Sequence, residues 1–271
     1  MIIGIDAGGS KTHAVLSIDG VIVNECITGC GNIHNDYQVA LNSIGNAIDF
    51  LLMSHPNKDC AIKIGVAGYS DIKLRNRLQV DLNQKYSNVK ITSDAHIACL
   101  AAHKGESGGV LICGTGVVGY INLNDQQIQL GGFGFPHGDL GGGAYIGLEI
   151  SRLLCKSLDG IIPFSPMLKQ IYQDFDNDYM KVKYWLMNAT VADYASIAKI
   201  MFKYTNDDSN AKNILMNAIN EVNQLLVLMY KYNVPIKLYG GLAEVYLPYL
   251  NSKFIDLGIC QINAAIGAVY L

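Results

Sequence analysis

The sequence predicts an α/β protein built from two domains of similar architecture. Three observations support this prediction. The chain has 271 residues, more than one average domain. Strand-like and helix-like segments alternate through the first hundred residues. A pattern of strand, glycine-rich turn and strand near residues 2–18 recurs near 110–121, which suggests a duplicated architecture.

The first predicted domain covers residues 1–106. Its strands are expected where short apolar runs lie between turn signals. A helix is expected over 36–53, where apolar residues recur at helical spacing, and Ser93-Asp94 opens a second, apolar helix over 95–103. The expected strands are 2–5, 13–18, 21–26, 61–67 and 89–92.

The second predicted domain covers residues 107–260, after a polar, glycine-rich segment at 104–109. It begins with the second strand–turn–strand pattern and becomes mostly helical after that. The expected elements are helices over 141–157, 191–204 and 209–231 within a largely helical region 168–231, a strand over 235–239, and a closing helix over 261–271.

Composition argues against several functional classes. The net charge is −3 and the basic residues are scattered, so no basic stripe suggests nucleic-acid binding. No apolar stretch is long enough to span a bilayer, and the apolar start is too short for a secretory signal. The seven cysteines form no Cys-x-x-Cys pair, which predicts reduced thiols and a cytoplasmic location. The six histidines lack metal-ligand spacing, so no zinc or iron–sulfur site is expected.

The turn of the first predicted hairpin, residues 6–12, carries groups suited to a phosphate. Asp6, at the end of the strand, can hold Mg²⁺ directly or through water. The same residue types also favour a plain β-turn, which is the alternative interpretation. The candidate phosphate donors are the backbone N–H groups of Gly8 and Gly9, the hydroxyls of Ser10 and Thr12, and the ammonium of Lys11.

Two further glycine-rich turns follow predicted strands. Gly114-Thr115-Gly116 offers one hydroxyl and several backbone N–H groups, so it is either a second phosphate clamp or a tight turn. Gly240-Gly241 ends a strand and would let a flat base or a ribose lie against bare backbone.

Two aspartates are candidates for chemistry on a hydroxylated substrate. Asp94 follows a strand and precedes a helix, so it is either a helix N-cap or a general base for an attacking hydroxyl. Asp139 lies in a loop with six glycines and two aromatics between residues 131 and 143, which suits a sugar; its alternative role is to cap the next helix. Asn32 lies in a turn after the third strand, where asparagine is common.

These motifs occur in an order that resembles the motif series of amino-sugar kinases. The chain is similar to the N-acetylglucosamine and glucosamine kinases of the BadF/BadG/BcrA/BcrD ATPase family, within the sugar kinase, Hsp70 and actin superfamily. The resemblance implies two ribonuclease-H-like domains of the actin-like ATPase type with a cleft between them. It also implies a closing helix 261–271 packed on the first domain. The motifs that carry the resemblance are Asp6 to Thr12, Ser93-Asp94-Ala95, Gly114-Thr115-Gly116, Gly138-Asp139 and Gly240-Gly241.

The resemblance further implies phosphorylation of an amino sugar at its 6-hydroxyl with ATP and Mg²⁺, and a homodimer. Asp94 corresponds to the catalytic base, which also contacts the sugar, and Asp6 to the metal site. The implied sugar ligands are Asn32, Asp139 and Gly132. The implied ATP ligands are Gly8, Gly9, Ser10, Lys11, Thr12, Gly114, Thr115, Gly116, Gly240 and Gly241.

The sequence departs from the family pattern at positions that bear on the substrate. Val117, followed by Val118, stands where the family commonly has a serine after Gly-Thr-Gly, which removes a hydroxyl. Leu140 replaces an acidic or polar residue; it disfavours a charged ammonium and so favours an N-acetyl sugar over glucosamine. Two alternatives stay open: an ATPase that activates a partner redox enzyme, and a non-catalytic sugar-binding sensor.

Overall fold

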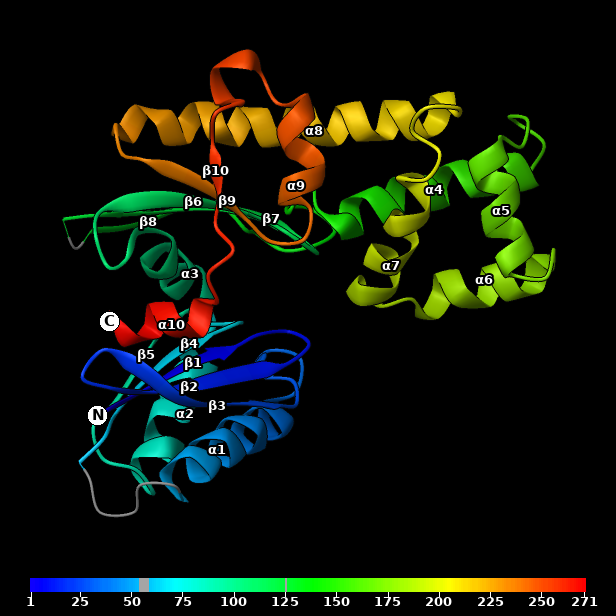
Figure 1. The fold of residues 1–271 in the computed structure, drawn as a ribbon. Helices are drawn as coiled ribbons and strands as arrows, with labels where there is room; N and C mark the ends of the chain where they lie inside the picture. Colours follow the sequence, from blue (N-terminus) through cyan, green and yellow to red (C-terminus); the bar gives the residue numbers. More distant parts are fainter. Residues whose placement is uncertain (54–58, 125) are drawn as a thin grey trace. The chain divides into compact units, whose positions relative to one another are not determined.

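The structure is a computed structural model that describes residues 1–53, 59–124 and 126–271 (Figure 1). It contains two five-stranded sheets, with strand orders β3-β2-β1-β4-β5 and β8-β7-β6-β9-β10. Adding five to each strand number of the first sheet gives the second. The duplicated α/β architecture predicted from the two hairpin patterns is therefore confirmed.

The chain divides into two compact units. Unit 1 comprises Met1–Val110, Tyr120–Ile128 and Cys260–Leu271, and unit 2 comprises Leu111–Gly119 and Gln129–Ile259. The boundary expected at residues 104–109 stays a prediction, because this division also assigns a later segment, 120–128, to unit 1.

The first sheet combines two hairpins with two parallel strands. β1 pairs antiparallel with β2, and β2 with β3, whereas β1, β4 and β5 run parallel. All five strands lie close to where the sequence predicted them. Their bounds are β1 Ile2–Ala7, β2 Thr12–Ile18, β3 Val21–Thr28, β4 Ala61–Val66 and β5 Val89–Ser93.

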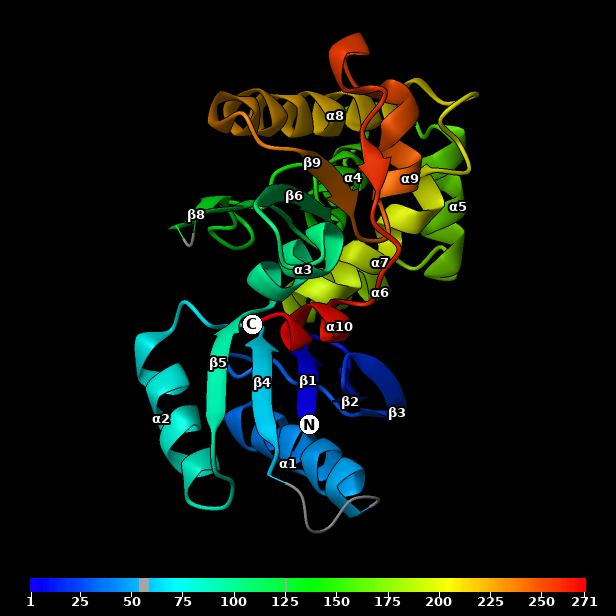
Figure 2. The ribbon, with the colours of Figure 1, turned by 60° about the vertical axis from the view of Figure 1, so that its left-hand side comes forward.

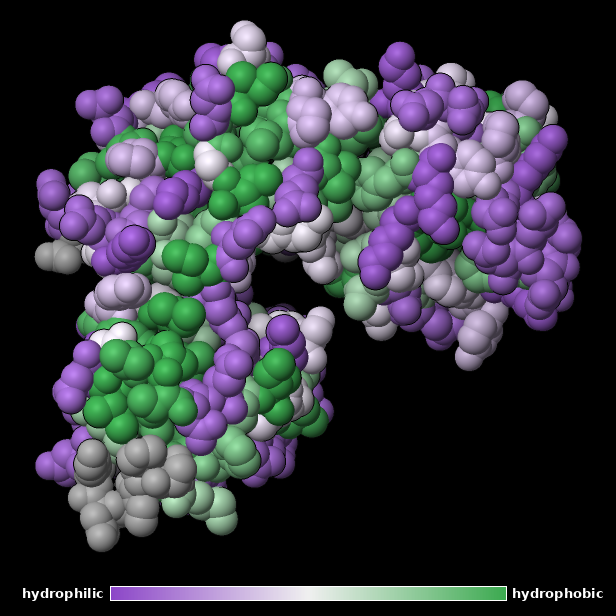
Figure 3. All heavy atoms as spheres, in the orientation of Figure 1, coloured by the Kyte–Doolittle hydropathy of each residue, from purple (hydrophilic) through white to green (hydrophobic). Residues whose placement is uncertain are grey.

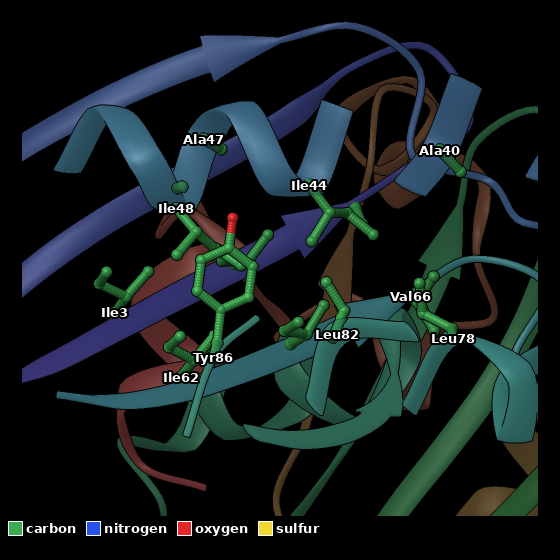
Figure 4. Close-up of a cluster of buried hydrophobic side chains, with 14 of the residues drawn as sticks. Ile3, Ala40, Ile44, Ala47, Ile48, Ile62, Val66, Leu78, Leu82 and Tyr86 are labelled. Carbon is green, nitrogen blue, oxygen red and sulfur yellow. The ribbon is translucent and has the colours of Figure 1, made fainter. Parts of the chain in front are cut away.

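Helices cover both faces of this sheet (Figures 1 and 2). α1 (Tyr37–Met53) and α2 (Ile72–Asn83) pack on one face, where Ile3, Ile44 and Leu82 belong to a buried apolar cluster (Figure 4). α3 (Asp94–His103) and α10 (Ala264–Val269) pack on the other. α10 approaches β1 at Gly4, where a β-carbon would collide with the carbonyl oxygen of Ala265.

The second sheet is followed by a largely helical region. α4 and α7 pack against each other, and α8 lies along the sheet, where Met229 contacts Gly119. Hydrophilic residues predominate on the visible surface over α5 and α6 (Figure 3). The bounds are β6 Gly108–Cys113, β7 Val117–Leu123, β8 Gln126–Gly131, α4 Gly143–Leu158, α5 Pro166–Asp174, α6 Tyr179–Asn188, α7 Val191–Met201, α8 Ser209–Met229, β9 Ile236–Tyr239, α9 Ala243–Tyr246 and β10 Gly258–Ile259.

One buried carboxylate ties two helices of unit 2 together. Asp208 is 3% exposed and caps α8 by accepting the N–H groups of Asn210 and Ala211 at 2.9 and 3.2 Å. Its second oxygen accepts the N–H of Met167, at the start of α5, at 2.8 Å. Burial alone would raise the pKa of Asp208, but the hydrogen bonds from these backbone amides outweigh it, so the pKa lies below its ordinary value.

We expect Asp208→Ala to lower the free energy of unfolding by about 2–3 kcal/mol, because a cap and a buried acceptor are lost together. Since the folded pKa is depressed, this contribution is complete above the unfolded pKa of about 4 and is lost as the pH falls through the folded pKa. Urea unfolding of both proteins at neutral and acidic pH measures this. Asp207→Ala, at the exposed neighbouring aspartate, is the control; equal losses in the two variants would contradict the prediction.

Candidate functional site

The parallel strands β1, β4 and β5 of unit 1 place Asp6 and Asp94 at the same end of the sheet, where these strands finish. Ala7 pairs with Val66, and Val66 pairs with Ser93, so these three residues form one row across β1, β4 and β5. Asp6 and Asp94 each adjoin this row in sequence. Strand register, rather than proximity in the chain, therefore brings the two carboxylates together.

Asp94 is not the N-cap of α3, which is one of the two roles that the sequence left open for it. Ser93 caps α3, with its Oγ accepting the N–H of His96 at 3.1 Å, so the N-cap interpretation of Asp94 is wrong. Asp94 lies in the first turn, and its Oδ1 accepts the N–H of Ala95 at 2.8 Å. Burial raises the pKa of Asp94, against the lowering effect of that amide. A desolvated carboxylate of this kind is a competent proton acceptor.

Asp6 has the electrostatic character of a cation ligand. Burial and the charge of Asp94 raise the pKa of Asp6 to about 7, while the nearby ammonium of Lys11 lowers it. Asp6 and Asp94 are both half-buried, and with one lysine nearby the pair leaves negative charge to be neutralised. Their hard oxygen ligands fit Mg²⁺, which commonly takes one or two carboxylates and completes its shell with water and substrate phosphates.

The first glycine turn leaves several of its polar groups accessible. The N–H of Gly8 donates to the carbonyl of Lys11 at 3.0 Å, which closes the turn. The carbonyl of Gly8 accepts the N–H of Gly31 at 2.9 Å, which fixes the turn against the segment after β3. Gly9, Ser10 and Lys11 are exposed. The turn therefore presents backbone, hydroxyl and ammonium groups to solvent.

Thr12 differs from its neighbours in the turn. It is 0% exposed, and a β-carbon on Gly31 would lie 2.6 Å from its hydroxyl oxygen. The hydroxyl has no hydrogen-bond partner within the described part of the chain. Its role as a phosphate ligand stays a prediction, and one that requires the turn to move, since the hydroxyl is enclosed.

Asn32, the candidate sugar ligand of unit 1, is partly buried in an Asx turn. Its Oδ1 accepts the N–H groups of His34 and Asn35 at 2.9 and 3.3 Å, and it lies close to Gly68, whose φ is +86°. The side-chain oxygen therefore serves the backbone. What Asn32 has left to offer a ligand is its amide N–H₂ group.

The Gly114-Thr115-Gly116 turn, which lies in unit 2, supports the start of α4. The N–H of Gly114 donates to the carbonyl of Gly116 at 2.9 Å. The carbonyls of Gly114 and Thr115 accept the N–H groups of Gly143 and Ala144, each at 2.9 Å. These bonds satisfy the first amides of α4 and fix the turn, while Thr115 stays exposed.

Asp139 lies directly against this turn. A β-carbon on Gly116 would come within 2.5 Å of the Asp139 carboxyl, so only glycine fits there. Asp139 does not cap α4, as the sequence left open, because the N-cap is Gly142. Burial raises the pKa of Asp139, although the Gly134 amide lowers it. Of the predicted residues, the structure thus brings Gly116 and Asp139 together.

Three other positions that bear on the predicted sugar site differ in exposure: Gly132, Val117 and Leu140. Gly132 has a φ of +69°, and a β-carbon there would contact the Val118 side chain. Val117 is 1% exposed and packs into the core, so this departure from the family pattern concerns packing. Leu140 is 37% exposed, so an apolar side chain is available beside Asp139.

A pocket of about 350 Å³ in unit 2 is lined by three of the predicted nucleotide residues. Gly240 turns the chain with a φ of +96°, and a β-carbon there would strike the Cys113 carbonyl, so the turn after β9 sits close on β6. The residues that line the pocket include Gly114, Thr115 and Gly241, which the sequence predicted, and Lys199, Phe202 and Leu242, which it did not. A largely apolar pocket beside the Gly114-Thr115-Gly116 turn fits a nucleoside.

Comparisons with known proteins agree with this geometry. The model of the BadF/BadG/BcrA/BcrD ATPase family matches residues 3–271. The glucosamine kinase GspK of Vibrio cholerae is 28% identical over 250 residues, which cover 89% of this chain and 85% of that protein. The N-acetylmuramic acid/N-acetylglucosamine kinase of Clostridium acetobutylicum is 27% identical over 241 residues, 82% of this chain and 76% of that protein.

Solved structures agree on the fold. A Chromobacterium violaceum protein described provisionally as an N-acetylglucosamine kinase superposes with a TM-score of 0.90 at 24% identity, covering 99% of this chain and 97% of that one. The fold is accordingly that of two ribonuclease-H-like domains of the actin-like ATPase type. Among the helices that the structure describes, none has the length and apolar character needed to cross a membrane.

Proposed function

The chain belongs to the BadF/BadG/BcrA/BcrD ATPase family, and we propose that it is an ATP-dependent amino-sugar kinase that phosphorylates the 6-hydroxyl of N-acetylglucosamine or glucosamine. The observation that carries the proposal is the half-buried Asp94 carboxylate in the first turn of α3. Ser93 takes over the helix cap, so Asp94 is left to act on a ligand. An attacking sugar hydroxyl needs such a proton acceptor.

In this proposal the two glycine turns position the phosphates of ATP. The proposed phosphate contacts in unit 1 are the Gly9 amide, Ser10 and Lys11, because the Gly8 amide already donates to the Lys11 carbonyl. Those in unit 2 come from the Gly114-Thr115-Gly116 turn. The pocket beside Gly241 holds the adenosine. Asp94 orients the 6-hydroxyl and would accept its proton as the oxygen attacks the γ-phosphorus, while the bond from that phosphorus to the bridging oxygen breaks and ADP leaves. Most of the rate enhancement comes from positioning and from stabilising charge.

Asp6 is the proposed Mg²⁺ ligand. When bound, the ion would neutralise part of the negative charge of the phosphates. Burial raises the pKa of Asp6, and the charge of Asp94 raises it further; the ion would relieve the repulsion between the two carboxylates. The Lys11 ammonium nearby adds a second positive charge for the phosphates.

The proposed sugar ligands are Asn32 and Asp94 in unit 1 and Gly132 and Asp139 in unit 2. Asn32 would donate through its amide nitrogen, since its oxygen is engaged in the Asx turn. Asp139 would accept from sugar hydroxyls. The exposed Leu140 favours an N-acetyl sugar over a charged amine. A homodimer stays a prediction from the family resemblance.

Sugar-dependent ADP release tests the proposal. The purified chain is incubated with Mg-ATP and with N-acetylglucosamine, glucosamine, N-acetylmuramic acid, glucose or no sugar. Release that depends on one amino sugar is the expected result, and NMR of the product identifies the phosphorylated hydroxyl. Release at the same rate without sugar would favour the redox-activating ATPase. Sugar binding by calorimetry without release would favour the sensor.

A further inference from the structure

Unit 1 contains a polar pocket that neither the nucleotide nor the sugar occupies in the proposed function. Its volume is about 430 Å³, within the range of about 300–1,000 Å³ that is usual for small-molecule sites. It lies along β5, the edge strand of the first sheet, and α3 and the β7–β8 hairpin form other walls. We refer to it as the β5 pocket.

Three polar side chains of the β5 pocket are more than nine-tenths buried. Thr92, His96 and Asn122 are 3%, 5% and 8% exposed. The side chain of Asn122 lines the pocket, so its amide is positioned to bond a molecule there.

A hydrogen-bonded network holds the imidazole of His96 in the wall. Its Nδ1 pairs with the hydroxyl of Thr92 at 2.9 Å, and its ring stacks on Tyr120 with centroids 5.5 Å apart. The Tyr120 hydroxyl in turn donates to Gln127 at 2.8 Å. Burial, with the charge of Lys90, lowers the pKa of His96 to about 4, so the ring is neutral near pH 7. Its Nε2 lacks a partner within the described residues and can bond a hydroxyl.

Lys90 is the one charged side chain among the described residues that line the pocket. Lys63 is its register partner on β4. Burial lowers the pKa of Lys63 and the charge of Lys90 lowers it further, so the two ammonium groups lie near each other. Their hydrogen bonds go to backbone oxygens, from Lys63 to Val269 at 2.9 Å and from Lys90 to Leu271 at 3.1 Å. No aspartate or glutamate side chain is among the described residues that line the pocket.

We propose that the β5 pocket binds an anionic, polyhydroxylated small molecule of the sugar-phosphate class. Neutral donors and acceptors from Asn122, His96 and Gln127 suit the hydroxyls of one sugar ring. The ammonium of Lys90 suits its phosphate. The ring of Tyr69, also in the wall, offers an apolar face for the sugar.

The pocket is coupled to the candidate catalytic base by the chain itself. Thr92 and His96 flank Asp94 by two residues on either side, and their side-chain hydrogen bond bridges the junction of β5 and α3. A ligand that bonds His96 would therefore bear on the strand end that carries Asp94. This effect on phosphate transfer rests on the proposed function, whereas binding in the pocket does not.

Calorimetry on the full chain tests binding directly. Glucosamine 6-phosphate and N-acetylglucosamine 6-phosphate are titrated without ATP, with excess unphosphorylated sugar present to occupy the substrate site. The expected result is saturable binding at one site per chain, weakened about tenfold or more by Asn122→Leu and by Lys90→Gln. Inorganic phosphate should bind more weakly, since it lacks the hydroxyls.

Lys73→Gln, at an exposed lysine on α2, is the matched control and should bind like the wild type. Lys90 is also exposed, so Lys90→Gln remains informative if the more buried Asn122→Leu fails to fold. Absence of saturable binding would overturn the proposal, as would binding that both pocket variants leave unchanged. If the chain proves not to be a kinase, these titrations still decide whether the pocket binds sugar phosphates.

Discussion

Asp94→Asn is expected to lower kcat by about 10²–10⁴-fold and to leave binding of the amino sugar nearly unchanged. Asparagine keeps the shape of the side chain, and its oxygen can still accept the N–H of Ala95 as Asp94 does at 2.8 Å. It cannot accept a proton from the attacking hydroxyl. The loss should therefore appear in the chemical step, while calorimetric titration of sugar into the variant should still show binding.

The matched control for this experiment is Asp19→Asn. Asp19 lies in the turn between β2 and β3 with a φ of +50°, a conformation that suits asparagine as well as aspartate, and Gly20 follows it. This variant removes one carboxylate from unit 1 and should keep full activity. A wild-type rate in Asp94→Asn would remove Asp94 from the role of base and would favour a different acceptor for the proton.

The sequence was most informative where function and local structure depend on the same few residues. The strand, polar turn and strand of residues 2–18 was predicted because alternation and glycine act over short distances, and β1 pairs with β2 as expected. α1 was predicted because its buried residues, such as Ile44 and Ile48, recur at helical spacing. Asp6 and Asp94 could be named as candidates one at a time, but their proximity depends on strand register.

Elements with weak patterns were missed. α2 buries only Leu78 and Leu82, so its sequence carries little helical periodicity. β10 is two residues long and is a strand because it pairs with β9, a contact that local sequence does not encode. The closing helix is shorter than expected, Ala264–Val269 within the predicted 261–271.

The sequence also could not predict residue roles that depend on a shift of one position or on packing between distant segments. Ser93 and Asp94 are both good N-caps, and only the backbone shows that Ser93 holds this position. Lys199 and Phe202 belong to a region where amphipathic helices gave no chemical signal, yet they line the pocket beside Gly241. Thr12 is buried because Gly31, far along the chain, packs against it.

Gly241→Val is expected to raise the KM for ATP about tenfold or more, a loss of about 1.4 kcal/mol or more of binding free energy. Gly241 lines the pocket of unit 2, and a β-carbon built there meets no atom within 4 Å, so a side chain would extend into open space that the nucleotide is proposed to fill. The fold should tolerate it, whereas valine at Gly240 would collide with the Cys113 carbonyl.

Gly258→Val separates occlusion of the pocket from a general effect of adding a side chain. Gly258 lies in β10, its added β-carbon also meets no atom within 4 Å, and it is not among the residues that line the pocket. Initial rates at varied ATP, with titration of a non-hydrolysable ATP analogue, compare the two variants. A raised KM in Gly241→Val alone would support the nucleotide assignment. Equal KM values in folded Gly241→Val and wild type would place the adenosine elsewhere, because a branched side chain cannot share that space with a nucleoside.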